Sequence, residues 1–94
     1  MEEGIDFDHK AAEKLMKDLA ECVELAKSSA RTIEMHANNL SVVWKDPMAP
    51  ELIRYLGLRV EAYDLVADYA EDMLNRLREI DSRIRAAQAA KACV

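Results

Sequence analysis

The chain has few of the residues that form turns and few aromatic residues. Among 94 residues there are two glycines and two prolines, and aromatic residues make up 5%. An all-β fold needs turn residues at regular short intervals, so this composition excludes one. With 51% hydrophobic and 33% charged residues, the chain also has too much apolar surface to remain disordered. The composition therefore predicts an all-α protein, and the length predicts a single domain over residues 1–94.

No basic leader and no long apolar run occur. A secretory signal peptide starts with a positively charged segment, whereas the first ten residues here include Glu2, Glu3, Asp6 and Asp8. The longest uncharged stretch, 35–44, contains polar residues and is shorter than the ~20 apolar residues that span a bilayer. We therefore expect no membrane insertion. We expect a protein that is cytoplasmic as made, and any export to proceed without a secretory signal peptide.

Positive charge and cysteine are also scarce. Thirteen Lys and Arg face 18 Asp and Glu, for a net charge of -5, so the chain is not expected to bind nucleic acid. The two cysteines, Cys22 and Cys93, do not form the framework of a disulfide-rich domain. In a helical hairpin they lie about half a helix length apart, beyond the ~7 Å that a disulfide tolerates. We expect reduced, structurally inert thiols.

Two long helical patterns make up most of the sequence. In the first, apolar residues recur at alternating steps of three and four, with a flanking row beside them, and Asp6 or Asp8 is the candidate N-cap. The main row comprises Ala12, Leu15, Leu19, Cys22, Ala26, Ser29, Ile33, His36, Leu40 and Val43, and the flanking row comprises Met16, Val23, Ala30, Ala37 and Trp44. The second pattern comprises Leu52, Leu56, Arg59, Tyr63, Val66, Ala70, Met73, Leu77, Ile80, Ile84 and Ala87.

A cluster of helix-breaking residues, 46–50, separates the two patterns. It contains Pro47 and Pro50, and a residue that precedes proline avoids the helical region. We expect one helix over residues of about 8–44, a turn over about 45–50 and a second helix over about 51–90. So short a connection between two long helices makes them antiparallel neighbours, which predicts a long α-helical hairpin.

The second helix carries a further apolar stripe that a hairpin alone does not require. It consists of Tyr55, Leu58, Ala62, Leu65 and Tyr69. Closer to the C-terminus, the same rows of this helix hold charged residues: Asp72, Arg76, Glu79 and Arg83. A second protein surface packed against this stripe would explain the switch, and we favour a homodimer or heterodimer that forms a four-helix bundle. The alternative is an unusually broad seam that the first helix fills.

The sequence offers no catalytic or cofactor-binding constellation. Acidic residues at helical spacing raise the possibility of a metal site, but His9 and His36 do not pair with them in an inward-facing pattern, and solvated charges are the preferred interpretation. Cys22 has no histidine within helical reach, and no glycine-rich loop is present to hold a phosphate. We therefore expect no enzyme activity, no cofactor and no metal.

The turn carries a family resemblance. Val43-Trp44-Lys45-Asp46-Pro47 places a tryptophan at the tip of a hairpin near the middle of the chain. Together with the length and the two predicted helices, this resembles the WXG family of small type VII secretion substrates and partners. Asp46 stands where the family has glycine. The Tyr-x-x-x-Asp/Glu export signal that many pairs carry after the second helix does not occur here.

The resemblance implies side-by-side packing of hairpins into a four-helix dimer and recognition by a membrane-bound secretion ATPase. Within the family, we favour an accessory hairpin that pairs with the N-terminal domain of a larger effector, such as an LXG-type toxin, and helps to target it, over a free exported homodimer. Trp44, Asp46 and Pro47 would form a recognition tip, and the second stripe of Tyr55, Leu58, Ala62, Leu65 and Tyr69 would face the partner. For Trp44, capping of the apolar seam is an equal alternative. For the whole chain, the alternative is a cytosolic structural adaptor or regulatory coiled coil.

Overall fold

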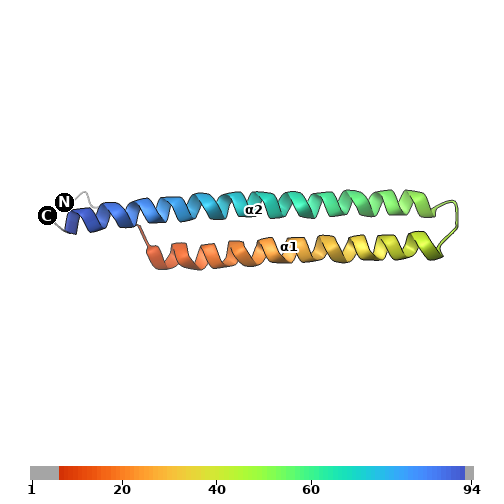
Figure 1. Cartoon of the computed structure of the whole chain (residues 1–94), viewed down its shortest axis with the longest axis horizontal. Coiled ribbons are helices and arrows are strands. Elements are labelled where there is room, and N and C mark those ends of the chain that lie inside the picture. Colours follow the sequence, from red (N-terminus) through yellow and green to blue (C-terminus); the bar gives the residue numbers. More distant parts are fainter. Residues whose placement is uncertain (1–6, 93–94) are drawn as a thin grey trace.

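Two long helices lie side by side in the computed structural model, which describes residues 7–92 (Figure 1). Helix α1 spans His9–Val43 and helix α2 spans Ala49–Ala92, and together they form an antiparallel hairpin of 73 × 16 × 16 Å. The predicted all-α hairpin is confirmed, and each helix begins and ends within two residues of its expected bounds. In the described range, neither helix has a stretch long and apolar enough to cross a membrane.

Helix α1 has a defined cap at each end. The carboxylate of Asp8 accepts a hydrogen bond from the backbone N–H of Ala11 at 3.0 Å, so Asp8 is the N-cap. Asp6, the other candidate, lies outside the described residues. At the far end Trp44 leaves the helical region, with φ -107° and ψ 110°, while its N–H still donates to the carbonyl of Leu40.

The seam between the helices is built mainly from small side chains. Ala30 is 0% exposed, and no large side chain in the described range is buried as completely. Alanine at the contact allows two helices to approach closely, so backbone and Cβ atoms supply much of the packing. The buried apolar residues are Ala12, Val23, Ala26, Ala30, Ala37, Ala49, Ala67, Ala70 and Leu74.

On α1, the seam uses a different pair of rows from the one predicted. The row expected to flank the seam, from Met16 through Ala30 to Trp44, is buried or half-buried against α2. Half of the row expected to fill it lies instead at the edge. These edge residues are Leu15, Cys22, Ser29, His36 and Val43, of which Ser29 is half-buried and the others are exposed.

The same correction applies to α2. The exposed members of the predicted stripe are Leu52, Arg59, Tyr63, Val66, Met73, Ile80 and Ala87. The other members, Leu56, Ala70, Leu77 and Ile84, are buried or half-buried as predicted, and they share the seam with a row that the prediction omitted, comprising Ile53, Val60, Ala67, Leu74 and Asp81. Each helix has three adjacent rows rich in apolar residues, so periodicity alone does not choose between two neighbouring pairs. The polar residues that interrupted the predicted stripes, Ser29, His36 and Arg59, all belong to the edge rows.

Candidate interaction face and turn

Ion pairs between the helices close one edge of the hairpin. Arg31 donates to both carboxylate oxygens of Asp64, at 2.8 and 2.9 Å, and Arg85 donates to Glu13 at 3.1 Å. Each pair joins an arginine on one helix to a carboxylate on the other, so both lie beside the seam. We call this side the closed edge.

The opposite side of the seam has apolar residues instead of ion pairs. Because the interhelix ion pairs occupy one edge of an antiparallel pair, the rows on the other side of the seam share the second edge, which we call the open edge. Its exposed apolar members are Leu15 and Val43 from α1 and Leu52, Val66, Met73 and Ile80 from α2. Arg59 is the charged residue among them, and its guanidinium lies over the Tyr55 ring and donates to the Tyr55 hydroxyl.

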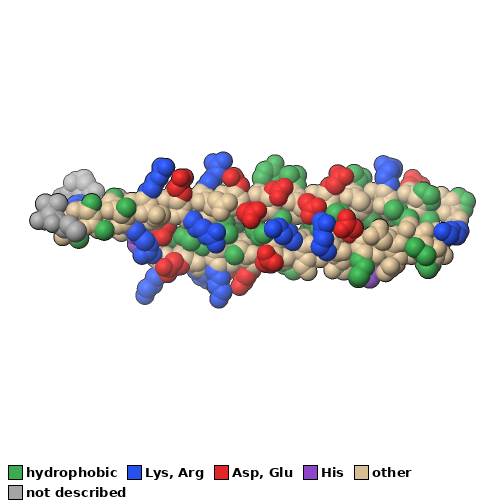
Figure 2. Space-filling view, in the orientation of Figure 1, with side chains coloured by type: hydrophobic (Ala, Val, Ile, Leu, Met, Phe, Trp, Pro, Cys, Tyr) green, Lys and Arg blue, Asp and Glu red, His purple; other side chains and the backbone are tan. Residues whose placement is uncertain are grey.

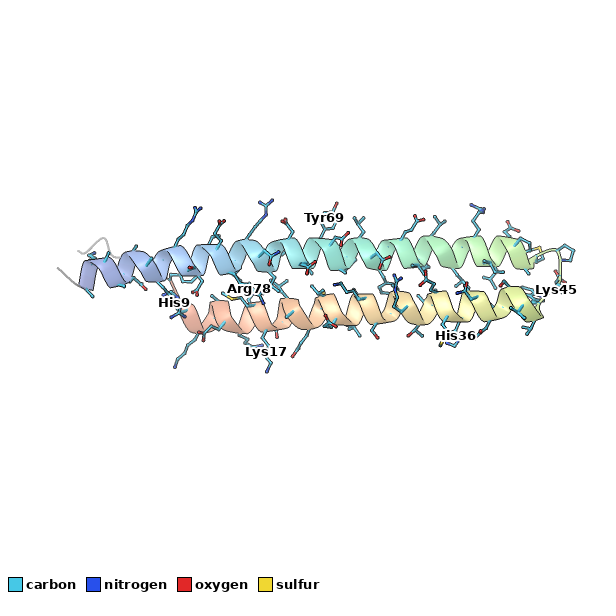
Figure 3. The ribbon with its side chains drawn as sticks, viewed as in Figure 1. His9, Lys17, His36, Lys45, Tyr69 and Arg78 are labelled. Carbon is cyan, nitrogen blue, oxygen red and sulfur yellow. The ribbon has the colours of Figure 1, made fainter. Side chains whose placement is uncertain are left out.

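The predicted partner-facing stripe continues from the open edge around α2. Its five residues, Tyr55, Leu58, Ala62, Leu65 and Tyr69, are all exposed, and we call them the outward face. Tyr69, at 64% exposed, points away from α1 (Figure 3). In the space-filling view, apolar side chains gather on the outer surface of α2 near mid-length and again near the turn (Figure 2). Helix α1 therefore does not cover this stripe, so the alternative of a broad seam does not describe it.

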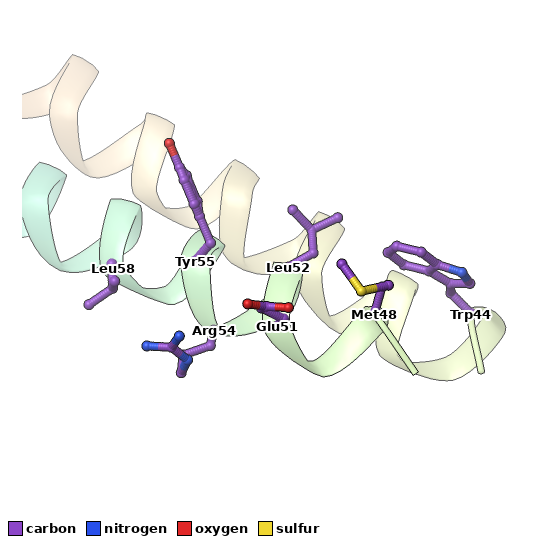
Figure 4. Close-up of a pocket in the computed structure, with 7 residues that line it drawn as sticks. All are labelled: Trp44, Met48, Glu51, Leu52, Arg54, Tyr55 and Leu58. Atoms are coloured by element: carbon purple, nitrogen blue, oxygen red, sulfur yellow. The ribbon is translucent and has the colours of Figure 1, made fainter. Parts of the chain in front are cut away.

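A hollow at the turn extends the outward face to the tip of the hairpin. It has a volume of about 570 Å³, and Trp44, Met48 and Leu52 line it together with the first two residues of the outward face (Figure 4). Glu51 and Arg54 complete the lining. A second hollow of about 550 Å³ lies between Trp44 and the turn residues Asp46 and Pro50. Trp44, itself half-buried, contributes to both hollows.

Asp46 holds the turn through two hydrogen bonds. The carboxylate of Asp46 accepts from the N–H of Met48 at 2.8 Å, and its carbonyl accepts from the N–H of Ala49 at 2.9 Å. Asp46 thereby satisfies backbone donors at the start of α2, as short acidic side chains do at helix N-termini. None of the described non-glycine residues has a positive φ, so this turn does not need the backbone freedom of glycine.

The sequence analysis missed a polar cluster at the end of the hairpin opposite the turn. His9, the first residue of α1, contacts Asp81 through Nδ1 at 2.5 Å and Gln88 through Nε2 at 2.8 Å. Asp81 also accepts from Arg85 at 2.8 Å, and its side chain is only 12% exposed. A carboxylate in the seam row is the signal that could have pointed to this cluster, because a buried charge needs partners.

The cluster shifts the protonation of its members. The hydrogen bonds of the His9 ring to Asp81 and Gln88 raise the pKa of His9 above its usual value. The bonds that Asp81 accepts from Arg85 and His9 hold the pKa of Asp81 below its usual value. Since both nitrogens of His9 face oxygen acceptors, the protonated ring satisfies both contacts as a double donor.

The remaining candidates for chemistry are dispersed. In the described part of the chain, no three His, Cys, Asp or Glu side chains are grouped closely enough to hold a metal ion. Cys22 and His36 are exposed in the edge row of α1, and Cys93 lies outside the described residues. The arrangement of the described residues is suited to binding another protein through apolar packing, with a polar closed edge that remains in water.

Comparisons with known proteins add no identification. The chain matches no model of a protein family, no curated protein and no solved structure.

Proposed function

We propose that this chain is a non-enzymatic pairing module whose outward face binds another helical hairpin. The observation that carries the proposal is the exposure of the outward face, where Leu58 and Leu65 are 56% and 51% exposed beside two exposed tyrosines. Apolar surface on the side of α2 that faces away from α1 is not covered within the hairpin, and such a patch is typical of a protein interface. A hairpin of the same kind buries that surface in a four-helix bundle.

We further propose that the module is a WXG-like component of a type VII secretion system. In this role it pairs with the helical N-terminal domain of a larger effector, such as an LXG-type toxin, and helps to present the complex to the secretion ATPase. The hairpin and the tryptophan at its tip support this assignment, and the turn geometry removes an objection to it, because Asp46 performs at the start of α2 a task that needs no glycine.

Co-expression with the N-terminal domain of a candidate LXG-type effector tests the pairing. We expect a complex of defined mass by light scattering, and its loss in the double variant Leu58→Asp, Leu65→Asp, which puts two charges on the outward face. The matched control is Ser28→Asp, Asn38→Asp, which adds the same charges at exposed positions of α1. Equal binding by both double variants, at matched helicity, would overturn the assignment of the face.

Export separates the secretion role from a cytosolic adaptor. Trp44→Ala is expected to leave the helix content unchanged and to reduce ATPase-dependent export of the effector, measured in culture supernatants. If Trp44→Ala unfolds the hairpin, the tryptophan acts as a cap of the seam. If effector export is the same with and without this chain, the cytosolic adaptor becomes the better description.

A further inference from the structure

One charged side chain lies within the apolar side of the hairpin. Among the α2 residues of the open edge and the outward face, Arg59 is the only one that carries a charge. Arg59 belongs to the open edge, and Tyr55, one helical turn earlier, belongs to the outward face. These two rows are neighbours on α2, so the Arg59 side chain lies between the two apolar surfaces. A partner that covers both surfaces therefore covers the guanidinium as well.

The charge of Arg59 is not neutralised within the hairpin. Three arginines farther along α2 each bond to a carboxylate four residues earlier: Arg76 to Asp72, Arg83 to Glu79 and Arg85 to Asp81. Four residues before Arg59 the chain has Tyr55 instead, and no carboxylate lies three or four residues to either side. The α1 row on the open edge, from Leu15 to Val43, contains no carboxylate either. Among the described residues, none forms an ion pair with Arg59.

Tyr55 positions the guanidinium and adds a second donor beside it. The Nε of Arg59 donates to the Tyr55 hydroxyl oxygen at 3.1 Å, Nη2 donates to the same oxygen, and the central guanidinium carbon lies 5.1 Å from the centre of the ring. No described residue accepts from Nη1, so the edge formed by Nη1 and Nη2 still has N–H groups to donate. The Tyr55 hydroxyl accepts from Arg59 and keeps its own proton for another acceptor.

We propose that Arg59 and the Tyr55 hydroxyl recognise a carboxylate of the partner, so that the apolar face of the partner hairpin carries an Asp or Glu opposite Arg59. This inference rests on the proposed function, because it names the chemistry of the hairpin that binds the same face. A guanidinium loses its water when a partner covers it, and this cost is large unless the partner supplies an opposite charge. The free edge of a planar guanidinium binds a carboxylate through two parallel hydrogen bonds.

This requirement makes Arg59 a determinant of partner choice. Leu58 and Leu65 can pack against any apolar surface of suitable shape. A hairpin with an apolar or basic residue opposite Arg59 leaves the guanidinium covered and without an acceptor, which weakens that complex relative to one with a carboxylate there. The leucines thus supply apolar contact area, and Arg59 selects among the hairpins that fit it.

Arg59→Leu tests the carboxylate by titration calorimetry with the N-terminal domain of a candidate LXG-type effector. Leucine extends the apolar surface, so it would strengthen binding to a partner that is apolar opposite this position. We expect the dissociation constant to rise by about 30-fold or more instead, because the carboxylate of the partner is then buried without its counter-charge. Arg78→Leu makes the same change in the row of Asp64 and Arg85, on the closed-edge side, and should leave the dissociation constant unchanged.

Conservative variants separate the charge from its geometry. Arg59→Lys keeps the charge but loses the two parallel hydrogen bonds, and it should raise the dissociation constant by about three- to tenfold. Tyr55→Phe keeps the ring and removes the hydroxyl, and it should raise the dissociation constant by about two- to tenfold. Arg59→Glu brings two carboxylates together and should abolish the complex.

Charge exchange identifies the residue on the partner. Each Asp and Glu on the apolar face of the effector domain is replaced in turn by Arg, and one replacement should restore binding to Arg59→Glu. An unchanged or lower dissociation constant for Arg59→Leu, or an equal rise for Arg78→Leu, would overturn the carboxylate and leave the proposed function standing. So would the failure of every exchange. A helical wild-type chain that binds no effector domain would overturn the proposed function and this inference together.

Discussion

The two edges of the hairpin differ in the side chains that flank the seam. On the closed edge, arginines and carboxylates from both helices pair across the seam, so that edge is complete within one chain. On the open edge, both helices present apolar residues, and these continue onto the outward face of α2. An edge that is satisfied by charge can remain in water, whereas an apolar edge gains free energy by being covered. Under the proposed function, the apolar side is therefore the one that contacts the partner.

The largest expected effect comes from breaking the seam that both edges share. Ala30→Leu adds a bulky side chain where the native residue is 0% exposed, so it should force the helices apart. We expect a loss of about 3 kcal/mol in the free energy of unfolding, measured by urea denaturation. Ala11→Leu, at an exposed position of α1, is the matched control. A loss as large in the control would mean that helix propensity and not seam packing sets the effect.

A gain in stability is expected on the closed-edge side of α2. Nothing lies within 4 Å of a Cβ atom placed on Gly57, and the residue sits inside a helix. Gly57→Ala should therefore raise the free energy of unfolding by about 1 kcal/mol, because alanine loses less backbone entropy. Thermal unfolding followed by circular dichroism would show the change. An unchanged or lower midpoint would indicate a strained helix at this position.

A smaller effect is expected from the closed edge itself. The side chains of Arg31 and Asp64 are 55% and 47% exposed, so water and salt screen their attraction. Arg31→Ala should lower the free energy of unfolding by about 0.5 kcal/mol at low salt and by less in 1 M NaCl. Urea denaturation at the two salt concentrations measures this. A salt-independent loss of several kcal/mol would contradict a screened surface pair.

The polar cluster of His9 and Asp81 should make the free energy of unfolding weakly dependent on pH. The raised pKa of His9 stabilises the fold fully below its unfolded value of about 6.5, and this contribution is lost as the pH rises through the higher folded value. The lowered pKa of Asp81 stabilises the fold above about 3.9, and this contribution is lost as the pH falls through the lower folded value. The cluster is thus strongest between these limits.

Thermal midpoints at pH 5.5 and at pH 8.5 test this linkage. The wild-type chain should lose stability between the two values through His9, and His9→Gln should remove that part of the loss. His36→Gln, at the exposed edge of α1, is the control that should retain it. If His36→Gln removed the pH dependence completely, the assignment of the effect to His9 would be wrong.

Much of the fold could be predicted because its signals are local. Two long periodic patterns and a proline-containing break predict two helices and an antiparallel turn, and Asp8 acts as one of the two predicted N-caps. The outward face could also be recognised, since Tyr55 through Tyr69 stand out on one helix without knowledge of the other. The His9–Asp81 cluster could not, because it joins residues far apart in the chain through the alignment of the helices.

The sequence by itself determined the helices, the turn and the presence of more apolar surface than one hairpin seam needs, because all three depend on spacing within a helix. Only the tertiary structure decided which two of three apolar rows meet. That choice depends on how closely the helices can approach each other at alanine residues such as Ala30 and Ala67. It also depends on the ion pairs that form at one edge of the seam, such as Arg31 with Asp64. Contacts of this kind are properties of two helices together.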